Sequence, residues 1–196
     1  MIAIIDYDTG NLRSVCNALD RIGAQYCLTD DPSLIAQADR VLLPGVGEAS
    51  SAMQKLQERG LCDAIRNLKV PVLGICIGMQ LMCRHSEEGN VDCLGIFDAD
   101  VRKFEADPAA GVKVPHMGWN SLVNLKTGLF GGLADGDFVY FVHSFAADVC
   151  EDTVAVSENG RRFSAAMRKG NFYGAQFHPE KSGEVGEKIL RNFMNL

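Results

Sequence analysis

Short apolar runs alternate with stretches of helical spacing in the first half of the chain, and this alternation restricts the fold more than any other feature. Residues 2–5, 41–43 and 70–75 are runs typical of strands buried on both faces of a parallel sheet. Apolar residues in 12–22 and 61–68 recur three and four positions apart, which places them on one helical face. Strand–helix–strand order implies right-handed crossovers, so the sequence predicts an α/β fold with a mostly parallel central sheet flanked by helices.

The second half of the chain has a different pattern. Short segments at 99–104, 138–142, 153–156, 163–168 and 172–177 are separated by Gly, Asp and Asn turns, which predicts antiparallel strands added to the sheet. Residues 185–193 return to helical spacing. We find no repeat or linker in the 196 residues, so residues 1–196 are expected to form a single domain.

Composition and charge exclude several classes of protein. A formal charge of −6 offers no basic stripe for a nucleic acid. The longest mostly apolar stretch, 70–83, is interrupted by proline and glycine and is shorter than the roughly 18 residues that a membrane span needs. The seven cysteines form an odd set without a CxxC pair, and the N-terminus reads as a strand rather than a secretion signal. We therefore expect a cytoplasmic protein with free thiols, no membrane contact and no metal site.

Cys76 stands at the junction of a predicted strand and a predicted helix. Gly74 and Gly78 lie two positions to either side, where small residues relieve the crowding around a nucleophile on a sharp turn. The N–H groups and dipole of the following helix would favour the thiolate. The alternative is an inert cysteine buried on a strand.

His178 is the best candidate for the base that a thiolate nucleophile requires. It follows the alternating segment 172–177, and strand ends are where active sites of α/β proteins collect. Glu180 can accept a hydrogen bond from one ring nitrogen and leave the other facing the sulfur, while Pro179 restricts the link between them. The alternative is a His and a Glu in a surface turn.

Six motifs together resemble those of the class I (triad) glutamine amidotransferases, and within them the glutaminase subunits of imidazole glycerol phosphate synthases. The motifs lie at residues 6–12, 44–47, 74–80, 115–120, 141–145 and 177–180. The first usually reads D-Y-G-x-G-N in such subunits, and this chain has Asp8 at the glycine position. Aspartate tolerates a left-handed backbone conformation, so the turn can be kept.

The resemblance implies a role for each matching residue. Cys76 would attack the carboxamide of glutamine, His178 would protonate the departing ammonia, and Glu180 would hold the imidazole. Oxyanion donors are expected from the N–H of Ile77 and from a loop, Gly45, Val46 and Gly47, whose central peptide could rotate to switch the site on. Glutamine is expected to contact Gly78, Gln80, His143, Ser144 and Phe145, although Gln80 could be an ordinary helix residue and His143 a core histidine. No cofactor is implied.

The chain has a way to release ammonia but no evident second domain in which to use it. Ammonia is mostly protonated at neutral pH, so its transfer calls for a sheltered path into another active site. The resemblance implies a heterodimer with a (β/α)8-barrel synthase subunit, which makes imidazole glycerol phosphate and aminoimidazole carboxamide ribotide in histidine biosynthesis. The expected interface residues are Asn11, His116, Trp119, Asn120, Tyr140 and Lys181, with a core aromatic as the alternative for Trp119.

Four other interpretations remain open at this point. The first is a stand-alone cysteine amidase or peptidase, and the second is the glutaminase of pyridoxal phosphate synthesis, which has a Gly-Gly-Glu-Ser-Thr segment where this chain has 44–48. The third is a catalytically silent scaffold subunit. The fourth, a metal hydrolase, is the weakest because no HxxxH or CxxC spacing is present. The sequence leaves any redox role of Cys83 and Cys93 undecided.

Overall fold

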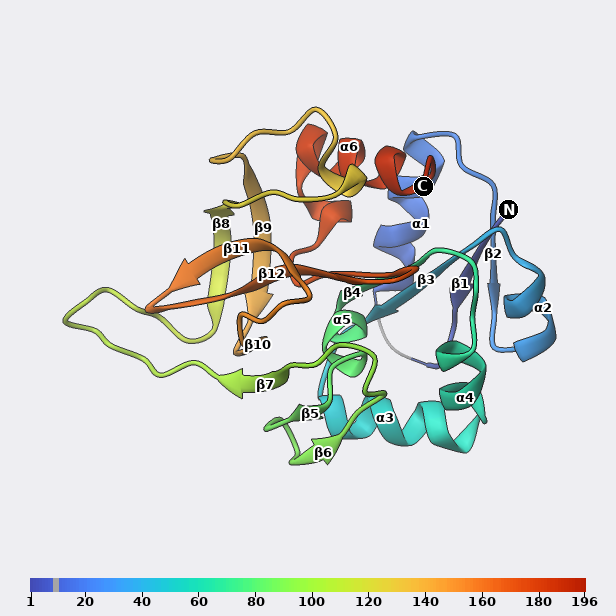
Figure 1. Ribbon diagram of the computed structural model, residues 1–196, viewed down its shortest axis with the longest axis horizontal. Helices are drawn as coiled ribbons and strands as arrows, with labels where there is room; N and C mark the ends of the chain where they lie inside the picture. The colour runs from blue at the N-terminus through green and yellow to red at the C-terminus, as the bar shows by residue number, and fades with distance from the viewer. Residues whose placement is uncertain (9–10) are drawn as a thin grey trace.

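A seven-stranded sheet forms the centre of the computed structural model, which describes residues 1–8 and 11–196 (Figure 1). Its strands are β1 (Ile2–Ile5), β2 (Tyr26–Thr29), β3 (Arg40–Gly45), β4 (Val72–Cys76), β11 (Thr153–Asn159), β12 (Arg161–Lys169) and β13 (Phe172–Ala175). They lie in the order β11-β12-β13-β4-β3-β1-β2. The five strands from β13 to β2 are parallel, and β12 and β11 extend the sheet antiparallel. The predicted fold class is confirmed.

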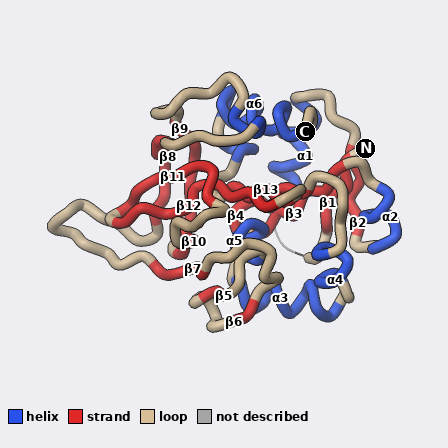
Figure 2. Tube along the Cα trace, viewed as in Figure 1, coloured by secondary structure: helices blue, strands red, loops and turns tan. Residues whose placement is uncertain are grey.

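Helices cover both faces of this sheet (Figure 2). α1 (Leu12–Arg21) and α6 (Gly183–Phe193) lie on one face, and α3 (Ala49–Glu58), α4 (Leu61–Arg66) and α5 (Ile77–Leu81) lie on the other; α2 (Pro32–Gln37) sits near the β2 edge (Figure 1). Of the apolar stripe predicted for 12–22, Val15 and Leu19 are buried, and Leu12, Cys16 and Ile22 are partly buried against the core. None of the helices in the described parts of the chain has the length and hydrophobicity that a membrane span requires.

Two smaller sheets stand beside the central one. The first contains β5 (His85–Ser86), β6 (Val91–Asp92), β7 (Asp100–Lys103) and β10 (Phe145–Ala147); the second is the hairpin of β8 (His116–Ser121) and β9 (Phe138–His143). Two 3-10 turns complete the fold, η1 (Gly128–Phe130) and η2 (Pro179–Lys181).

The prediction that segments 99–104 and 138–142 extend the central sheet is wrong, because they form β7 and β9 of these smaller sheets. Alternation along β9 reveals a strand with one buried face, Val139, Phe141 and His143. The alternation does not indicate which strand β9 pairs with, because strand pairing depends on residues distant in the sequence.

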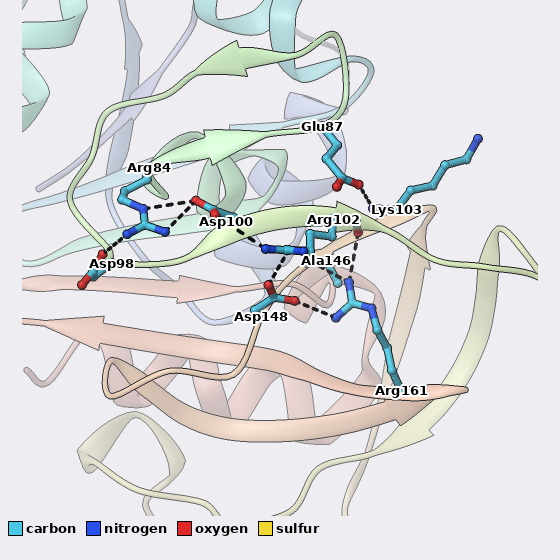
Figure 3. A network of polar contacts seen from close by, with 9 residues as sticks. All are labelled: Arg84, Glu87, Asp98, Asp100, Arg102, Lys103, Ala146, Asp148 and Arg161. Atoms are coloured by element: carbon cyan, nitrogen blue, oxygen red, sulfur yellow. Dashed lines mark hydrogen bonds and ion pairs between the residues drawn. The ribbon is translucent and has the colours of Figure 1, made fainter.

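Arg161 ties the central sheet to the first of the small sheets (Figure 3). From β12, its guanidinium donates to Asp148 Oδ1 at 3.2 Å and to the carbonyl oxygens of Arg102 and Ala146 at 3.1 and 3.0 Å. Arg102 of β7 pairs with the same carboxylate at 2.7 Å. The network holds β7 and β10 against β12, and β10 begins at Phe145, one of the residues expected to contact the substrate.

Candidate active site

Cys76 occupies a strained turn between β4 and α5. Its φ of 54° and ψ of −110° are unusual for a residue with a Cβ, and backbone strain of this kind is concentrated at functional sites. A Cβ at Gly78 would overlap the Leu43 carbonyl oxygen, and one at Gly74 would lie 2.6 Å from the Gly78 carbonyl oxygen. The two glycines therefore let this turn pack closely. The helix that follows spans only five residues, so the N–H groups of its first turn matter more than its dipole.

His178 and Glu180 lie beside Cys76, although they come from the far end of the chain. The His178 Nδ1–H donates to Glu180 Oε1 at 2.7 Å, and both residues are buried. His178 Nε2 has no hydrogen-bond partner among residues 1–8 and 11–196. Cys76 and His178 line the same cavity of about 300 Å³. Cys76 and His178 thus meet at one cavity, and Glu180 orients the imidazole from behind through its hydrogen bond to Nδ1.

The charge balance around His178 favours its protonated form. Burial is the largest influence and lowers the pKa, but interactions with Cys76 and Glu180 together outweigh it and raise the pKa to about 9. The ring therefore carries a proton at neutral pH, and an imidazolium next to a cysteine stabilises its thiolate.

Asn11 contacts the same carboxylate. Its side-chain Nδ2 donates to Glu180 Oε1 at 2.9 Å, from a left-handed backbone position at the start of α1. The sequence predicted that Asn11 lies at a partner interface. In the structure its side-chain NH2 group is hydrogen-bonded to Glu180 of the candidate site. The local sequence held no signal for this contact, because it joins opposite ends of the chain.

Gln176 and Gln80 extend the site on the other side of the sulfur. Gln176 Nε2 donates to Cys76 Sγ at 3.7 Å, and Gln80 Nε2 donates to Gln176 Oε1 and to the Phe145 carbonyl oxygen, both at 2.9 Å. Both glutamines are buried. Gln80 thus lines the cavity as expected. The sequence analysis did not predict a role for Gln176, although its position two residues before His178, at the end of the same strand, could have indicated one.

The cavity contains most of the residues expected around the substrate. Those that line it are Val46, Gly47, Cys76, Ile77, Gln80, His143, Ser144, Phe145, His178 and Lys181. Gly45 and Gly78 do not line it. Gly45 pairs with Cys76 in the sheet, where a Cβ would overlap the Tyr7 hydroxyl, and Gly78 packs against Leu43. Their role is close packing beneath the site.

Glu88 also lines the cavity and was not found from the sequence, where it belongs to no motif. It is the one acidic side chain among the described lining residues, and its Oε2 accepts the N–H of Ala49 at 3.0 Å. Burial, aided by the charge of Glu48, raises the pKa of Glu88, while the Ala49 N–H opposes the shift. The lining of the cavity therefore includes an acidic side chain as well as the Cys76 thiol.

The expected interface residues divide between the two faces of the β8–β9 hairpin. Trp119 is 55% exposed, with its ring 6.0 Å from that of its cross-strand neighbour Tyr140, and Lys181 is exposed at the cavity rim. His116 faces the opposite way and is only 9% exposed, since the strand alternates and its cross-strand partner is the buried His143. His116 is thus largely buried within this chain, and its expected contact with a partner stays a prediction. Asn120 shares that inner face and donates to the Glu158 carbonyl oxygen at 2.8 Å.

The other thiols lie away from the cavity. Cys83 and Cys93 are buried and free, and burial is the main cause that raises the pKa of both, that of Cys93 to about 12. Thiols of this kind react slowly, so nothing in their surroundings supports a redox role.

Comparison with known proteins places the chain in a family. The family described as "Glutamine amidotransferase class-I" matches residues 3–196, and the chain belongs to it. Its relatives include "Imidazole glycerol phosphate synthase subunit HisH" of Bacteroides fragilis, 55% identical over 195 residues that cover 100% of this chain and 99% of the relative. The protein of the same name from Xanthomonas axonopodis pv. citri is 47% identical over 196 residues, covering 100% and 97%.

Solved structures share the fold at low sequence identity. A putative GMP synthase protein from Thermoplasma acidophilum has a TM-score of 0.73 and 22% identity, with 99% of this chain and 92% of that chain covered. A structure titled as a glutamine amidotransferase has a TM-score of 0.75 and 18% identity, covering 100% and 98%. The resemblance seen in the sequence motifs is thus confirmed for both family and fold.

Proposed function

We propose that this chain hydrolyses L-glutamine to glutamate and ammonia as the glutaminase subunit of imidazole glycerol phosphate synthase in histidine biosynthesis. The observation that carries the proposal is the His178–Glu180 hydrogen bond of 2.7 Å at the cavity that Cys76 also lines. The full-length relatives named as a subunit of that synthase confirm the prediction of such an enzyme made from the motifs.

The reaction follows from the roles of the three side chains. The Cys76 sulfur attacks the carboxamide carbon, and the electron pair of the C=O bond moves onto oxygen. The His178 imidazolium gives its proton to the amide nitrogen of the substrate, and the C–N bond breaks. Ammonia departs, and the glutamyl group remains bound to Cys76 as a thioester. Neutral His178 then takes a proton from water as the water attacks the thioester, and returns it to the sulfur as glutamate leaves. Glu180 keeps the imidazole in one orientation through both halves.

The cavity lining supports a mode of glutamine recognition. The Glu88 carboxylate complements the α-ammonium group of glutamine. Both N–H groups of the Gln80 amide are used by Gln176 and Phe145, whereas its Oε1 is buried without a hydrogen-bond partner in the described parts of the chain. Gln80 would therefore accept a hydrogen bond from the substrate instead of donating one. Backbone groups of 143–145 complete this side of the cavity.

The oxyanion site would be completed by the loop after β3. Ile77 follows the nucleophile directly, and Val46 and Gly47 line the same cavity. Gly47 has a φ of 101°, a conformation that suits only glycine, whereas Gly45 is held in the strand. We therefore expect Gly47, and not Gly45, to allow the peptide between Val46 and Gly47 to rotate.

A (β/α)8-barrel synthase subunit would dock on the outer face of the β8–β9 hairpin. Met117, Trp119 and Phe138 on this face are 62%, 55% and 55% exposed, and large apolar side chains that are exposed together on one face mark a site of protein–protein contact. Pro115, which directly precedes β8, and the exposed Lys181 both line the cavity, so this face adjoins the glutaminase site. Docking here would shelter the ammonia released at Cys76 from water. The heterodimer would work in the cytoplasm, where histidine is made.

Reconstitution tests the function. Glutamate release is measured for the chain alone, with a barrel synthase subunit, and with that subunit plus its nucleotide, using Cys76→Ala as the control. We expect little activity alone and strong activity in the liganded complex. Full activity without a partner would instead identify a stand-alone amidase. Absence of activity with every barrel subunit, including that of pyridoxal phosphate synthase, would identify a silent scaffold.

A further inference from the structure

The inner face of the β8–β9 hairpin carries a continuous chain of hydrogen bonds that ends in the glutamine cavity. Asn120 Nδ2 donates to the Glu158 carbonyl oxygen at 2.8 Å and lies 3.2 Å from His116 Nε2. His116 Nδ1 lies 2.9 Å from His143 Nε2, and His143 Nδ1 lies 2.8 Å from the Phe145 carbonyl oxygen. Neither histidine takes part in the three-residue mechanism described above.

The direction of this chain is fixed independently from both ends. A carbonyl oxygen can only accept, so the Phe145 end requires a proton on His143 Nδ1, which makes Nε2 of the neutral ring an acceptor and His116 Nδ1 a donor. At the other end the Asn120 amide presents its NH2 group to the Glu158 carbonyl oxygen, so His116 Nε2 must accept and its Nδ1 must again donate. The two ends therefore demand the same tautomer of each ring.

The surroundings keep both rings neutral. Burial lowers the pKa of His116. Burial is also the main cause that lowers the pKa of His143 to about 3; nearby His178 and Arg161 add to it, and the hydrogen bond to the Phe145 carbonyl opposes it. The remaining ring neighbours are apolar: Phe104, Phe141 and Phe163. An added proton on either ring would place two donors face to face, so the chain admits only the neutral, single-tautomer arrangement.

The Phe145 carbonyl oxygen is where this chain meets the active site. It accepts from His143 Nδ1 at 2.8 Å and also from Gln80 Nε2 at 2.9 Å. Gln80 in turn donates to Gln176, whose amide donates to the Cys76 sulfur. Displacement of this carbonyl would therefore disturb both the cavity wall at 143–145 and the glutamine side chains next to the nucleophile.

We propose that His116 is a positioning residue for glutamine binding, which holds His143 in the Nδ1–H tautomer and thereby fixes the Phe145 carbonyl and Gln80. The inference deepens the proposed glutaminase function and rests on it. Without the His116 donor, His143 Nε2 loses its partner, the Nε2–H tautomer becomes accessible, and the donor to the Phe145 carbonyl oxygen is lost. We expect this to disturb substrate binding more than the chemical step, since the hydrogen bonds of His116 and His143 go to Asn120, to each other and to Phe145.

Three variants of the chain, each in complex with its liganded synthase subunit, separate positioning from space filling. His116→Phe keeps an aromatic ring stacked near Phe141 but removes the donor, whereas His116→Asn restores an N–H close to the position of Nδ1. His85→Phe is the matched control, because His85 lies on β5 and pairs with Asp92. For His116→Phe we expect a KM for glutamine raised by about 10-fold with kcat nearly unchanged, rescue by His116→Asn to within about threefold of wild type, and no effect of His85→Phe.

Nitrogen-15 NMR of histidine-labelled protein gives a readout that needs no turnover. The chain has 4 histidines, so each ring can be assigned by substitution. We expect His143 to carry its proton on Nδ1 in the wild type and in His116→Asn, and to show Nε2 protonation in His116→Phe. A wild-type KM in His116→Phe, equal impairment of His116→Phe and His116→Asn, or a wild-type His143 protonated on Nε2 would each overturn the positioning role. Absence of turnover in the wild-type complex would instead refute the glutaminase function.

Discussion

Asn11 and His178 donate to one and the same oxygen of Glu180, at 2.9 and 2.7 Å. The Glu180 Oε2 atom is buried and has no hydrogen-bond partner within the described residues, so the orientation of the carboxylate depends on the bonds to Oε1. The imidazole at the Cys76 cavity is thus held through a carboxylate that is itself held by Asn11, the residue that precedes α1.

Removal of the Asn11 amide should slow the reaction. For Asn11→Ala we expect kcat to fall by about 10-fold or more, since hydrogen bonds to charged groups are worth roughly 1.5–3 kcal/mol. The variant should remain folded because Asn11 is only partly buried. Steady-state kinetics of the liganded complex measure the loss, and Asn17→Ala on the outer part of α1 is the control. A wild-type kcat for Asn11→Ala would mean that His178 alone orients Glu180.

The raised pKa of His178 should make stability depend on pH. A group whose pKa is higher in the folded than in the unfolded state stabilises the fold fully below the unfolded value and loses that contribution as pH rises through the folded value. With a folded pKa of about 9, the free energy of unfolding should fall between about pH 6.5 and about pH 9. Urea denaturation across this range should show the fall in wild type and a flatter profile in His178→Gln. Parallel profiles for the two proteins would contradict the assignment of the raised pKa to this ring.

Gly47 should be needed for catalysis rather than for folding. A Cβ at Gly47 meets no atom within 4 Å, so the cost of Gly47→Ala lies in its φ of 101° and in the lost freedom of the loop. We expect kcat to fall by about 100-fold, the effect of losing one oxyanion donor. Gly170→Ala is the matched control, because it also has a positive φ and open space but lies in the turn between β12 and β13. If both variants turn over glutamine normally, the loop does not supply the oxyanion site.

Glu88 should govern affinity for glutamine. Glu88→Gln removes the negative charge offered to the α-ammonium group, and we expect KM to rise by about 10-fold or more with a smaller change in kcat. Glu87→Gln, next in the sequence but bonded to the Lys103 backbone N–H outside this cavity, should behave as wild type. The same KM for both variants would remove Glu88 from the substrate site.

Trp119 should anchor the synthase subunit. Truncation of a central aromatic anchor typically costs about 2 kcal/mol or more, so Trp119→Ala should weaken binding by about 30-fold while the thermal unfolding temperature stays close to that of wild type. Isothermal titration calorimetry with the barrel subunit measures the change. Leu34→Ala, with a similarly exposed apolar side chain on α2, should bind normally. Undiminished affinity of Trp119→Ala would place the interface elsewhere.

Local sequence patterns were sufficient for strands β1, β3 and β4, for helices α1, α4 and α6, and for the Cys76 turn. Residues 2–5 form β1 as predicted, and the glycines around Cys76 sit where their neighbours leave no room for a side chain. Helical spacing failed to reveal α3 and α2, and β2 was missed because only one of its four residues, Thr29, is buried. Weakly apolar elements carry weak periodic signals, so their existence depends on what they pack against.

Sequence alone determined the chemistry of this protein: a cysteine on a strand–helix turn and a His-Pro-Glu turn, each recognisable because its residues act over a few positions of one backbone. Tertiary structure decided which other side chains serve that chemistry. Asn11 reaches Glu180, Glu88 enters the cavity, and His116 turns inward to His143, because strand register and helix packing bring together residues that are separated in the sequence. Such contacts are set by the packing of the whole core, and no local spacing encodes them.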